Sequence, residues 1–453
     1  MLIRFSIQNF RSFGKHASLS LVANGRLDQL RDHVVDLGDI RLLRGTYIYG
    51  ANAAGKSNLI KAVDFARQII VKGSADTVRL DQYCKVCSES LNQPGVFQFE
   101  MVVDGKVYSY GFAISYRDGT IVEEWLYQLF KNGSETCLFE RDDAGSIDTE
   151  MRLKGMDETR FKIYADDMKA LTKTLFLTEL ARKHTDASSV LSAFRAVYKW
   201  FKRIIVIFPG SEFLPLPFLV HQDNMREQYE RYLRYFDTGI SQIEVDTTTL
   251  DKALSHLPKE DADQLRQLIL QNISDEKEFA VRGPGVLLGI RSVQNGEVLV
   301  DKLKLQHQDA SEGFDLTDES DGTQRLFDLV PILFQEMNNS VVFVDEIERS
   351  MHPLLARRFI NLFYEQTRNK QMQLIVTTHE SPLLDLTLIR RDEIWFVKRY
   401  PEGSKLYSLD DYKVRHDKQI DKDYLLGRYG AVPVFSSGTM QVSEGCTNGA
   451  PQT

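Results

Sequence analysis

The chain has 453 residues, of which 43% are hydrophobic and 26% are charged. This length predicts two or three domains, and the composition is ordinary for a globular protein. The net charge of -8 argues against a protein that coats nucleic acid, although a local basic groove stays open. The longest apolar runs, such as Ile204–Phe208, are too short to cross a membrane, and the first residues lack the apolar core of a signal peptide. We therefore expect a cytoplasmic protein.

The first part of the chain reads as strands, one helix and a hairpin. Residues 1–8 alternate apolar and polar side chains, as a strand does. A second strand over 46–49 runs into a glycine-rich loop, and a helix is expected over 57–70 because its apolar residues share one face. Two alternating segments then meet at Asp104-Gly105, which predicts a hairpin within an antiparallel meander.

Cysteines are sparse. Cys84 and Cys87 form one C-x-x-C pair, but Cys137 and Cys446 do not supply a second pair at the spacing of a zinc site. We therefore expect reduced structural thiols.

Residues 151–284 differ from the first part, because charged helical patterns such as MKALTKTLFLTELARK dominate them. We interpret this segment as an inserted, mainly helical domain. After residue 285, apolar strands alternate with helices expected over 323–337 and 353–367, which indicates a parallel sheet. The expected organisation is one half of the main domain at 1–150, the insertion, the other half of the main domain at 285–435, and a disordered tail at 436–453.

The stretch YGANAAGKSNL contains the motif G-x-x-x-x-G-K-S, with Gly50, Gly55, Lys56 and Ser57 at its fixed positions. Glycines let successive backbone N–H groups face a phosphate, Lys56 adds positive charge, and Ser57 offers its hydroxyl to Mg²⁺. Because a strand precedes the motif and a helix follows it, the motif predicts a site for a nucleoside triphosphate.

A phosphate-binding loop needs an acidic partner at the end of another strand. The stretch VVFVDE ends on Asp345, which would hold the Mg²⁺ shell, and Glu346, which would polarise the attacking water. The plainer alternative is a parallel strand that merely ends in two acids. Since Asp345 lies far along the chain from Lys56, the nucleotide-binding core is predicted to be split by a large insertion.

The stretch ESDGTQRLFDL fits the signature loop of a split ABC-type head. Ser320 and Gly322 match the loop, whereas Asp321 and Thr323 depart from the ABC consensus. Ser320 equally fits a simple helix N-cap.

A histidine completes the order of motifs. LIVTTHE places His379 at the end of the next strand, where it would contact the γ-phosphate; a lone histidine would more often be structural. IERSMHP lies where a D-loop would cross a dimer interface, and His352 there is more simply a turn residue before Pro353.

Together these residues resemble a known family. IQNFRSFG, with Asn9–Phe13, and the P-loop are similar to RecF/SMC-type ABC ATPases. Adding VEEWLY, SDGTQRLFDL, DEIERSMHPLL and TTHESPLLDLTLIRRDEIWFVKR, the chain resembles the bacterial AAA-type ATP-binding proteins of the RloA/AbiLii abortive-infection group. In that group the signature loop commonly reads S-D-G-T, so Asp321 and Thr323 fit it.

The resemblance implies an α/β fold: a split ABC-type P-loop head with a mixed sheet and an antiparallel meander, plus an inserted helical domain. It implies a homodimer or higher homo-oligomer with ATP and Mg²⁺ at the interface, and an effector, often a nuclease or toxin, in anti-phage defence. The implied ATP ligands are Arg11, Ser12, Gly50, Asn52, Ala53, Ala54, Gly55, Lys56, Ser57 and Asn58, with Ser320, Asp321 and Gly322 acting from the other subunit. The implied catalytic residues are Lys56, Glu346 and His379, and the implied Mg²⁺ ligands are Ser57 and Asp345.

Other functions stay open. A RecF-like ATPase would act directly on nucleic acid, and FRAVYKWFKRIIVIFP mixes Lys199, Lys202 and Arg203 with aromatic residues as nucleic-acid sites can. An amphipathic helix that enters a buried strand is the plainer interpretation of that stretch. A transporter ATPase is disfavoured by the long insertion and the N-F-R-S-F segment.

Overall fold

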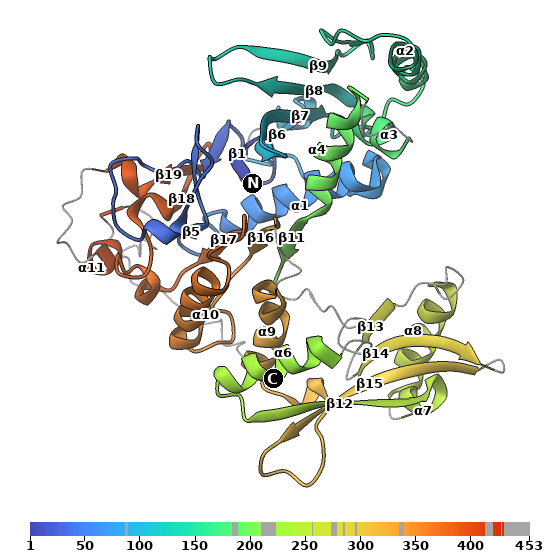
Figure 1. The fold of residues 1–453 in the computed structure, drawn as a ribbon, viewed down its shortest axis with the longest axis vertical. Helices are drawn as coiled ribbons and strands as arrows, with labels where there is room; N and C mark the ends of the chain where they lie inside the picture. Colours follow the sequence, from blue (N-terminus) through green and yellow to red (C-terminus); the bar gives the residue numbers. More distant parts are fainter. Residues whose placement is uncertain are drawn as a thin grey trace, which may run out of the picture.

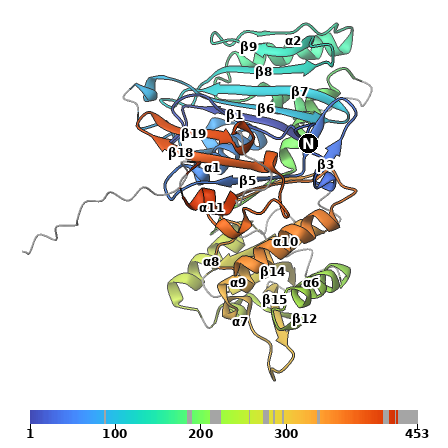
Figure 2. The same ribbon diagram turned by 90° about the vertical axis from the view of Figure 1, so that its left-hand side faces the viewer.

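The computed structural model describes residues 1–86, 89–183, 189–209, 223–255, 257–272, 279–283, 286–294, 297–334, 339–412, 420–426 and 428–429. Within these residues the chain forms four sheets and the helices that cover them (Figure 1 and Figure 2). The described cysteines, Cys84 and Cys137, are buried. Cys87, Cys446 and the tail expected at 436–453 lie outside the described residues. No described helix has both the length and the apolar character that crossing a membrane requires.

A six-stranded sheet brings the two halves of the chain together. Its order is β11-β16-β17-β5-β18-β19, and all neighbours are parallel except β18 and β19. The strands are β5 (Gly45–Tyr49), β11 (Ile204–Ile207), β16 (Val341–Val344), β17 (Gln373–Thr378), β18 (Ile394–Tyr400) and β19 (Gly403–Ser408). Parallel strands place their carboxyl ends on one edge of a sheet. The segments that follow β5, β16 and β17 therefore share one edge.

The two faces of this sheet pack against different helices. Ile48, Phe343 and Ile375 belong to a core shared with α1 (Lys56–Lys72). Val344 and Val376 belong to a second core with α9 (Asp321–Leu329) and α10 (Pro353–Gln366). Because side chains alternate between the faces of a strand, a continuous apolar run such as VVFV is buried on both sides.

A seven-stranded antiparallel sheet lies beyond α1, at the top of Figure 1. Its order is β10-β9-β8-β7-β6-β1-β2. The strands are β1 (Leu2–Gln8), β2 (Ala17–Ser20), β6 (Gly95–Val103), β7 (Lys106–Ile114), β8 (Ile121–Leu129), β9 (Glu135–Arg141) and β10 (Ile147–Asp148). Asp104 and Gly105 have φ values of 49° and 74°, the left-handed pair that a tight hairpin turn requires. The predicted hairpin and meander are confirmed.

The segment after the meander packs against the seven-stranded sheet. It contains α2 (Met156–Met168), α3 (Phe176–Arg182) and α4 (Ser192–Lys202). Phe201 of α4 meets Phe99 and Tyr110 of the sheet, with ring centroids 5.0 Å and 5.4 Å away. The stretch FRAVYKWFKRIIVIFP is thus an amphipathic helix that leads into β11, as its plainer interpretation held.

A smaller module lies at the lower right of Figure 1. Its four-stranded sheet has the order β12-β15-β14-β13, built from β12 (Ile240–Thr249), β13 (Phe279–Gly283), β14 (Val286–Gln294) and β15 (Glu297–His307). The accompanying helices are α6 (Asp223–Tyr235), α7 (Leu250–Leu254) and α8 (Lys259–Asn272). Residues 151–284, expected to be mainly helical, therefore also contribute β11, β12 and β13, and the pairing of β13 with β14 crosses residue 284. The sequence of β12, ISQIEVDTTT, is largely polar, so the alternation of apolar and polar side chains that would indicate a strand is weak.

Helix ends follow local chemistry. The helix expected over 323–337 ends at Leu329 and passes into a 3-10 turn, Val330–Leu333, because Pro331 lacks a backbone N–H. The helix expected over 353–367 is confirmed as α10. The remaining elements are β3 (Val34–Asp36), β4 (Arg41–Leu43) and α11 (Ile420–Leu425).

Candidate nucleotide-binding site

The loop between β5 and α1 packs closely against the backbone and side chains around it. A Cβ on Gly50 would lie 2.6 Å from the carbonyl oxygen of Val397. Gly55 has a φ of 118°, and a Cβ there would lie 2.6 Å from Ser404 Oγ and 2.7 Å from Ser12 Oγ. Gly50 is therefore required by space, and Gly55 by both space and conformation.

Lys56 begins α1 and folds back over the loop. Its Nζ donates hydrogen bonds to the carbonyl oxygens of Gly50 at 2.6 Å and Ala51 at 3.3 Å. Burial lowers the pKa of Lys56, while the charges of Glu348, Glu346 and Asp345 act in the opposite direction. The ammonium group thus lies in the field of the acids that follow β16, as a site for a phosphate and a metal requires.

Three segments far apart in the sequence meet beneath the loop. The backbone N–H of Ser404 donates to Ser12 O at 2.6 Å, and Ser404 Oγ donates to Ala54 O at 2.6 Å. Asn58 Nδ2 donates to Ser12 Oγ at 2.9 Å. The segment after β1, the phosphate-binding loop and the start of β19 therefore hold one another in place.

Arg11 lies next to this junction in a left-handed conformation, with φ of 50°. Its backbone N–H donates to Gln82 O at 2.6 Å. Its side-chain Nε is buried and has no hydrogen-bond partner within the described residues. A buried donor without a partner is uncommon and fits an acceptor supplied by a ligand.

Thr377 links the two acids that follow β16. Its Oγ1 donates to Asp345 Oδ1 at 2.6 Å and accepts from the backbone N–H of Glu346 at 2.8 Å. Asp345 is only 3% exposed, and Glu346 has a φ of 50°. The neighbouring strand β17 therefore fixes both acids, a role for Thr377 that sequence reasoning missed.

Glu348 is a second residue that sequence reasoning missed. Its Oε1 accepts from the backbone N–H of His379 at 2.9 Å and lies 2.9 Å from His379 Nδ1. The Glu348 side chain is 3% exposed, whereas that of His379 is 49% exposed. A buried carboxylate thus orients an exposed imidazole whose other nitrogen stays available. The signal was present in IERSMHP, but only the fold shows which acid meets the histidine.

Arg325 connects the signature helix to the same edge of the sheet. Its guanidinium donates to Asp345 O at 2.9 Å, Glu346 O at 3.3 Å and Phe208 O at 3.2 Å. Burial lowers the pKa of Arg325, and nearby Asp328 and Asp345 counteract this. Helix α9 is therefore tied to the segment that carries the acids within one subunit.

The signature residues lie at the start of α9. Ser320 is the N-cap, because its Oγ accepts from the N–H of Thr323 at 3.2 Å, and Ser320 and Asp321 are exposed. A Cβ on Gly322 would lie 2.7 Å from the carbonyl oxygen of Ser350, so the signature turn and the 349–351 turn are in close contact. His352 caps α10 by accepting from the N–H of Leu354, which agrees with its simpler interpretation.

The structure places the predicted residues of one subunit at the carboxyl edge of the sheet. The loop 50–58 follows β5, Asp345 and Glu346 follow β16, and His379 follows β17. Ser57 and Asp345 present hard oxygen donors, and Thr377 occupies only one oxygen of Asp345. This donor set fits Mg²⁺, which takes oxygen ligands and completes its shell with water and phosphate oxygens.

A family profile described as "AAA domain, putative AbiEii toxin, Type IV TA system" matches residues 46–151 and 221–387, more than half of the chain. The chain belongs to this family. The match confirms the resemblance to AAA-type proteins of the abortive-infection kind. Its two segments contain the loop after β5 and the acids and histidine after β16 and β17.

Two solved structures of SMC heads are similar at low identity. The SMC head bound to the C-winged helix domain of ScpA is 12% identical over 92% of this chain and 99% of that chain, with a TM-score of 0.41. The SMC head domain from Thermotoga maritima is 14% identical over 90% of this chain and 98% of that chain, with a TM-score of 0.37. No curated protein matches the chain. The α/β split-head fold rests on the strand order, in which β5 lies between β17 and β18 of the distant half.

Proposed function

We propose that the protein is an ATP hydrolase that closes as a homodimer around ATP and regulates a partner effector in a bacterial defence system. The observation that carries the catalytic part is the meeting of the loop 50–57, Asp345, Glu346 and His379 at one edge of the sheet, although they come from both halves of the chain. Membership of the AAA family supports a nucleotide as the ligand.

Each group has a role in the proposed hydrolysis. The N–H groups of the loop and Lys56 would bind the β- and γ-phosphates, and Ser57 and Asp345 would hold Mg²⁺, which would neutralise the charge on these phosphates. Glu346 accepts the proton of the attacking water. His379, oriented by Glu348, donates to the γ-phosphate, and Lys56 leaves the carbonyls of Gly50 and Ala51 for phosphate oxygens.

The second subunit completes the proposed site. Ser320 and Asp321 are exposed at the N-terminus of α9, a nine-residue helix whose first N–H groups suit a phosphate. Within one subunit, the contact of Gly322 with Ser350 and the bonds of Arg325 to Asp345 and Glu346 tie this helix to the catalytic acids. Closure of the dimer therefore affects the acids through a short chain of direct contacts.

The partner effector is proposed from the family description, which names a toxin-antitoxin system. We expect a gene for a nuclease or toxin beside this gene. Its product should co-purify with the protein, and its activity should change when ATP is added. A gene that stands alone among replication genes, with an ATPase stimulated directly by DNA, would instead favour a repair function.

Hydrolysis is tested with Glu346→Gln. The amide cannot accept a proton, so turnover measured by phosphate release should fall about 100-fold or more, since a general base contributes at least that much. ATP binding should persist, and the variant should accumulate as an ATP-bound dimer in light scattering. Glu365→Gln, on the exposed face of α10, is the matched control and should hydrolyse ATP normally. Wild-type turnover in Glu346→Gln would sink the assignment of the base.

A further inference from the structure

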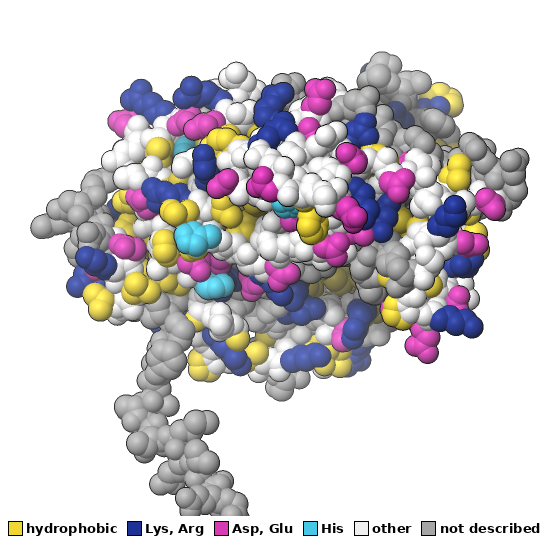
Figure 3. Space-filling view, turned by 90° about the horizontal axis from the view of Figure 1, so that it is seen from below, with side chains coloured by type: hydrophobic (Ala, Val, Ile, Leu, Met, Phe, Trp, Pro, Cys, Tyr) yellow, Lys and Arg dark blue, Asp and Glu magenta, His cyan; other side chains and the backbone are white. Residues whose placement is uncertain are grey.

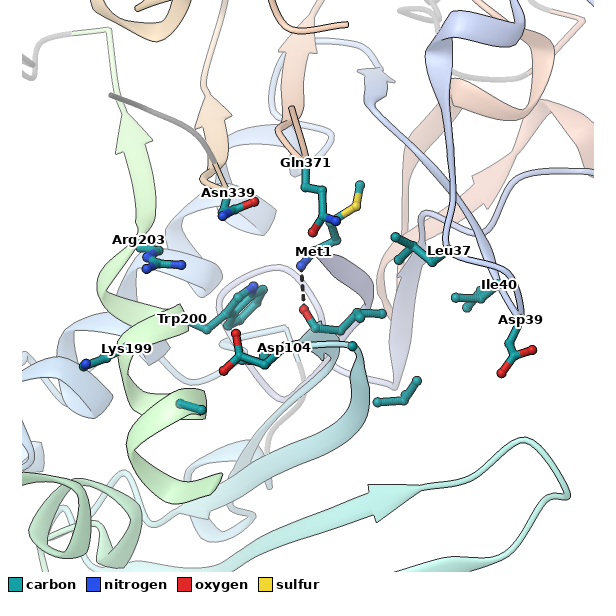
Figure 4. A pocket seen from close by; sticks show the side chains of 15 residues that line it. Met1, Leu37, Asp39, Ile40, Asp104, Lys199, Trp200, Arg203, Asn339 and Gln371 are labelled. Carbon is teal, nitrogen blue, oxygen red and sulfur yellow. Dashed lines mark hydrogen bonds between the residues drawn. The ribbon is translucent and has the colours of Figure 1, made fainter. Parts of the chain in front are cut away.

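A hollow of about 330 Å³ lies at the opposite edge of the six-stranded sheet from the nucleotide site. Arg203, Asn339 and Gln371 line it, and they lie just before β11, β16 and β17 respectively. Figure 4 shows these side chains grouped with Trp200 and Met1 around one space. The same three strands lead to Phe208, Asp345 and His379 at their other ends. The hollow is therefore a separate place in the fold.

The wall of this hollow offers hydrogen-bond donors that lack acceptors. Trp200 is 4% exposed, and its Nε1 is buried without a hydrogen-bond partner in the described residues. Lys199 and Arg203 line the same hollow and have no ion-pair partner within that part of the chain. The amine of Met1, by contrast, already donates to Val102 O at 2.7 Å. An occupant with anionic oxygens would satisfy the indole N–H and both cations.

A second hollow, of about 710 Å³, extends along α4 and shares Asp104, Ala196 and Lys199 with the first. Arg195 and Lys106 line it as well. Arg195 and Lys199 lie four residues apart on one side of α4, and Arg203, four residues further on, is the C-cap of the helix, so that each step rises about 6 Å. The two hollows thus form one groove with a regularly spaced basic stripe.

Acidic side chains in the groove interrupt this stripe. Asp39 is paired with Lys131, but Asp104 faces the groove beside Lys199. Both aromatic side chains that line the hollows, Trp200 and Tyr108, are buried, at 4% and 2% exposure. Neither ring is therefore open for a base to stack on, which disfavours a single-stranded nucleic acid as the occupant.

We propose that this groove binds an extended, acidic peptide segment of a partner protein. Alternate side chains of an extended strand are about 6.6 Å apart, close to the step of the basic stripe on α4. Carboxylates at alternate positions would meet Arg195, Lys199 and Arg203, and the deeper end would reach the indole N–H of Trp200. A short segment of four or five residues spans the stripe. This inference goes beyond the proposed ATPase function and does not depend on it.

The test uses the full-length protein and a fluorescein-labelled octapeptide of alternating Glu and Gly. Fluorescence anisotropy should show saturable binding, and a peptide with Gln in place of Glu should not bind. Lys199 and Arg203 are exposed, so Lys199→Glu and Arg203→Glu, which each replace an attraction by a repulsion, should each weaken binding about fivefold. Trp200→Phe, which keeps the packing but removes the N–H donor, should weaken binding about threefold.

The matched control is Lys202→Glu. Lys202 is exposed on α4 but lines neither hollow, so its reversal should leave the affinity within about twofold of wild type. Equal losses in Lys199→Glu, Arg203→Glu and Lys202→Glu would mean non-specific attraction and would overturn the proposal. Tighter binding of a labelled hexanucleotide than of the peptide, lost in the same two variants, would reassign the groove to nucleic acid. Thermal melts identify any variant that fails to fold. In that case the comparison of the Glu peptide with the Gln peptide on wild-type protein tests the proposal, and equal binding of the two peptides would overturn it.

Discussion

Ser404 shows how a single side chain can organise the candidate site. It is 5% exposed, and its two hydrogen bonds reach Ser12 and Ala54. A Cβ on Gly55 would also lie only 2.6 Å from its Oγ. Nothing in the sequence around Ser404 indicates this role, because both partners are more than a domain away along the chain.

We therefore predict that Ser404→Ala weakens nucleotide binding. The loss of the bond to Ala54 O removes about 1 kcal/mol, which corresponds to a dissociation constant about fivefold higher for ATP. Calorimetric titration with ATP measures this effect, and turnover at saturating ATP should change less than the affinity does. Ser408→Ala is the control, since Ser408 Oγ accepts from the N–H of Asp410 away from the loop. An unchanged affinity in Ser404→Ala would show that the hydrogen bond does not hold the loop.

The residues that could be predicted are those whose chemistry is local in the sequence. Gly50, Gly55, Lys56 and Ser57 work through one loop, so their spacing identifies them. Thr377 and Glu348 act through contacts between the ends of neighbouring strands, and the strand order is needed to see that they meet Asp345 and His379 respectively. For the same reason the role of Arg325, whose partners are backbone carbonyls, has no sequence signal.

At the scale of elements, segments with a clear apolar periodicity were predicted correctly as strands and helices, whereas largely polar segments were not. β1, β5, α1 and the hairpin at Asp104 follow from periodicity and turn chemistry. The strand β12 was missed because only one of its faces is buried, and that face is buried only in part, so its sequence shows little apolar alternation. The extent of α9 depended on one residue, Pro331.

The contact between two turns predicts the effect of Gly322→Ala. Gly322 lies in the first turn of α9, where alanine favours a helix, so any loss reports on space rather than on helix propensity. The added Cβ would lie 2.7 Å from Ser350 O and must push the signature turn away from the 349–351 turn. We expect ATP-dependent dimerisation and turnover to fall about tenfold, with ATP binding by the single subunit unchanged.

Analytical ultracentrifugation with ATP and a phosphate-release assay measure these two quantities. Gly25→Ala is the control, because nothing lies within 4 Å of the Cβ that it adds. If Gly322→Ala dimerises and hydrolyses ATP like the wild type, the packing of the two turns has no part in closure.

At the scale of the whole molecule, charge is dispersed rather than gathered. On the face seen in Figure 3, basic and acidic side chains are interspersed among the coloured residues. This pattern agrees with the net charge of -8 and leaves the groove along α4 as a local feature. Buried polar groups join distant segments as well, in addition to the apolar cores.

Glu124 is such a group, and it makes stability depend on pH. It joins β8 to the start of α3, accepting from Tyr110 Oη at 2.9 Å and from the N–H groups of Phe176 and Leu177 at 2.7 Å and 3.0 Å. Burial nevertheless raises the pKa of Glu124 from 4.5 to about 7, outweighing these donors and the charge of Arg141. A carboxyl group with a raised pKa in the folded state stabilises that state fully below pH 4.5, and this contribution is lost as the pH rises to about 7.

We predict that Glu124→Gln removes this pH dependence. The amide has no proton to lose, so the wild type should lose about 3 kcal/mol of free energy of unfolding relative to the variant between pH 4.5 and pH 7. Urea denaturation followed by circular dichroism at several pH values in this range measures the difference. Glu123→Gln is the matched control, because Glu123 is exposed on the other face of β8 and should give a curve parallel to the wild type. Parallel curves for Glu124→Gln as well would mean that the three donated hydrogen bonds keep the carboxylate ionised in the folded protein, so that burial does not set its titration.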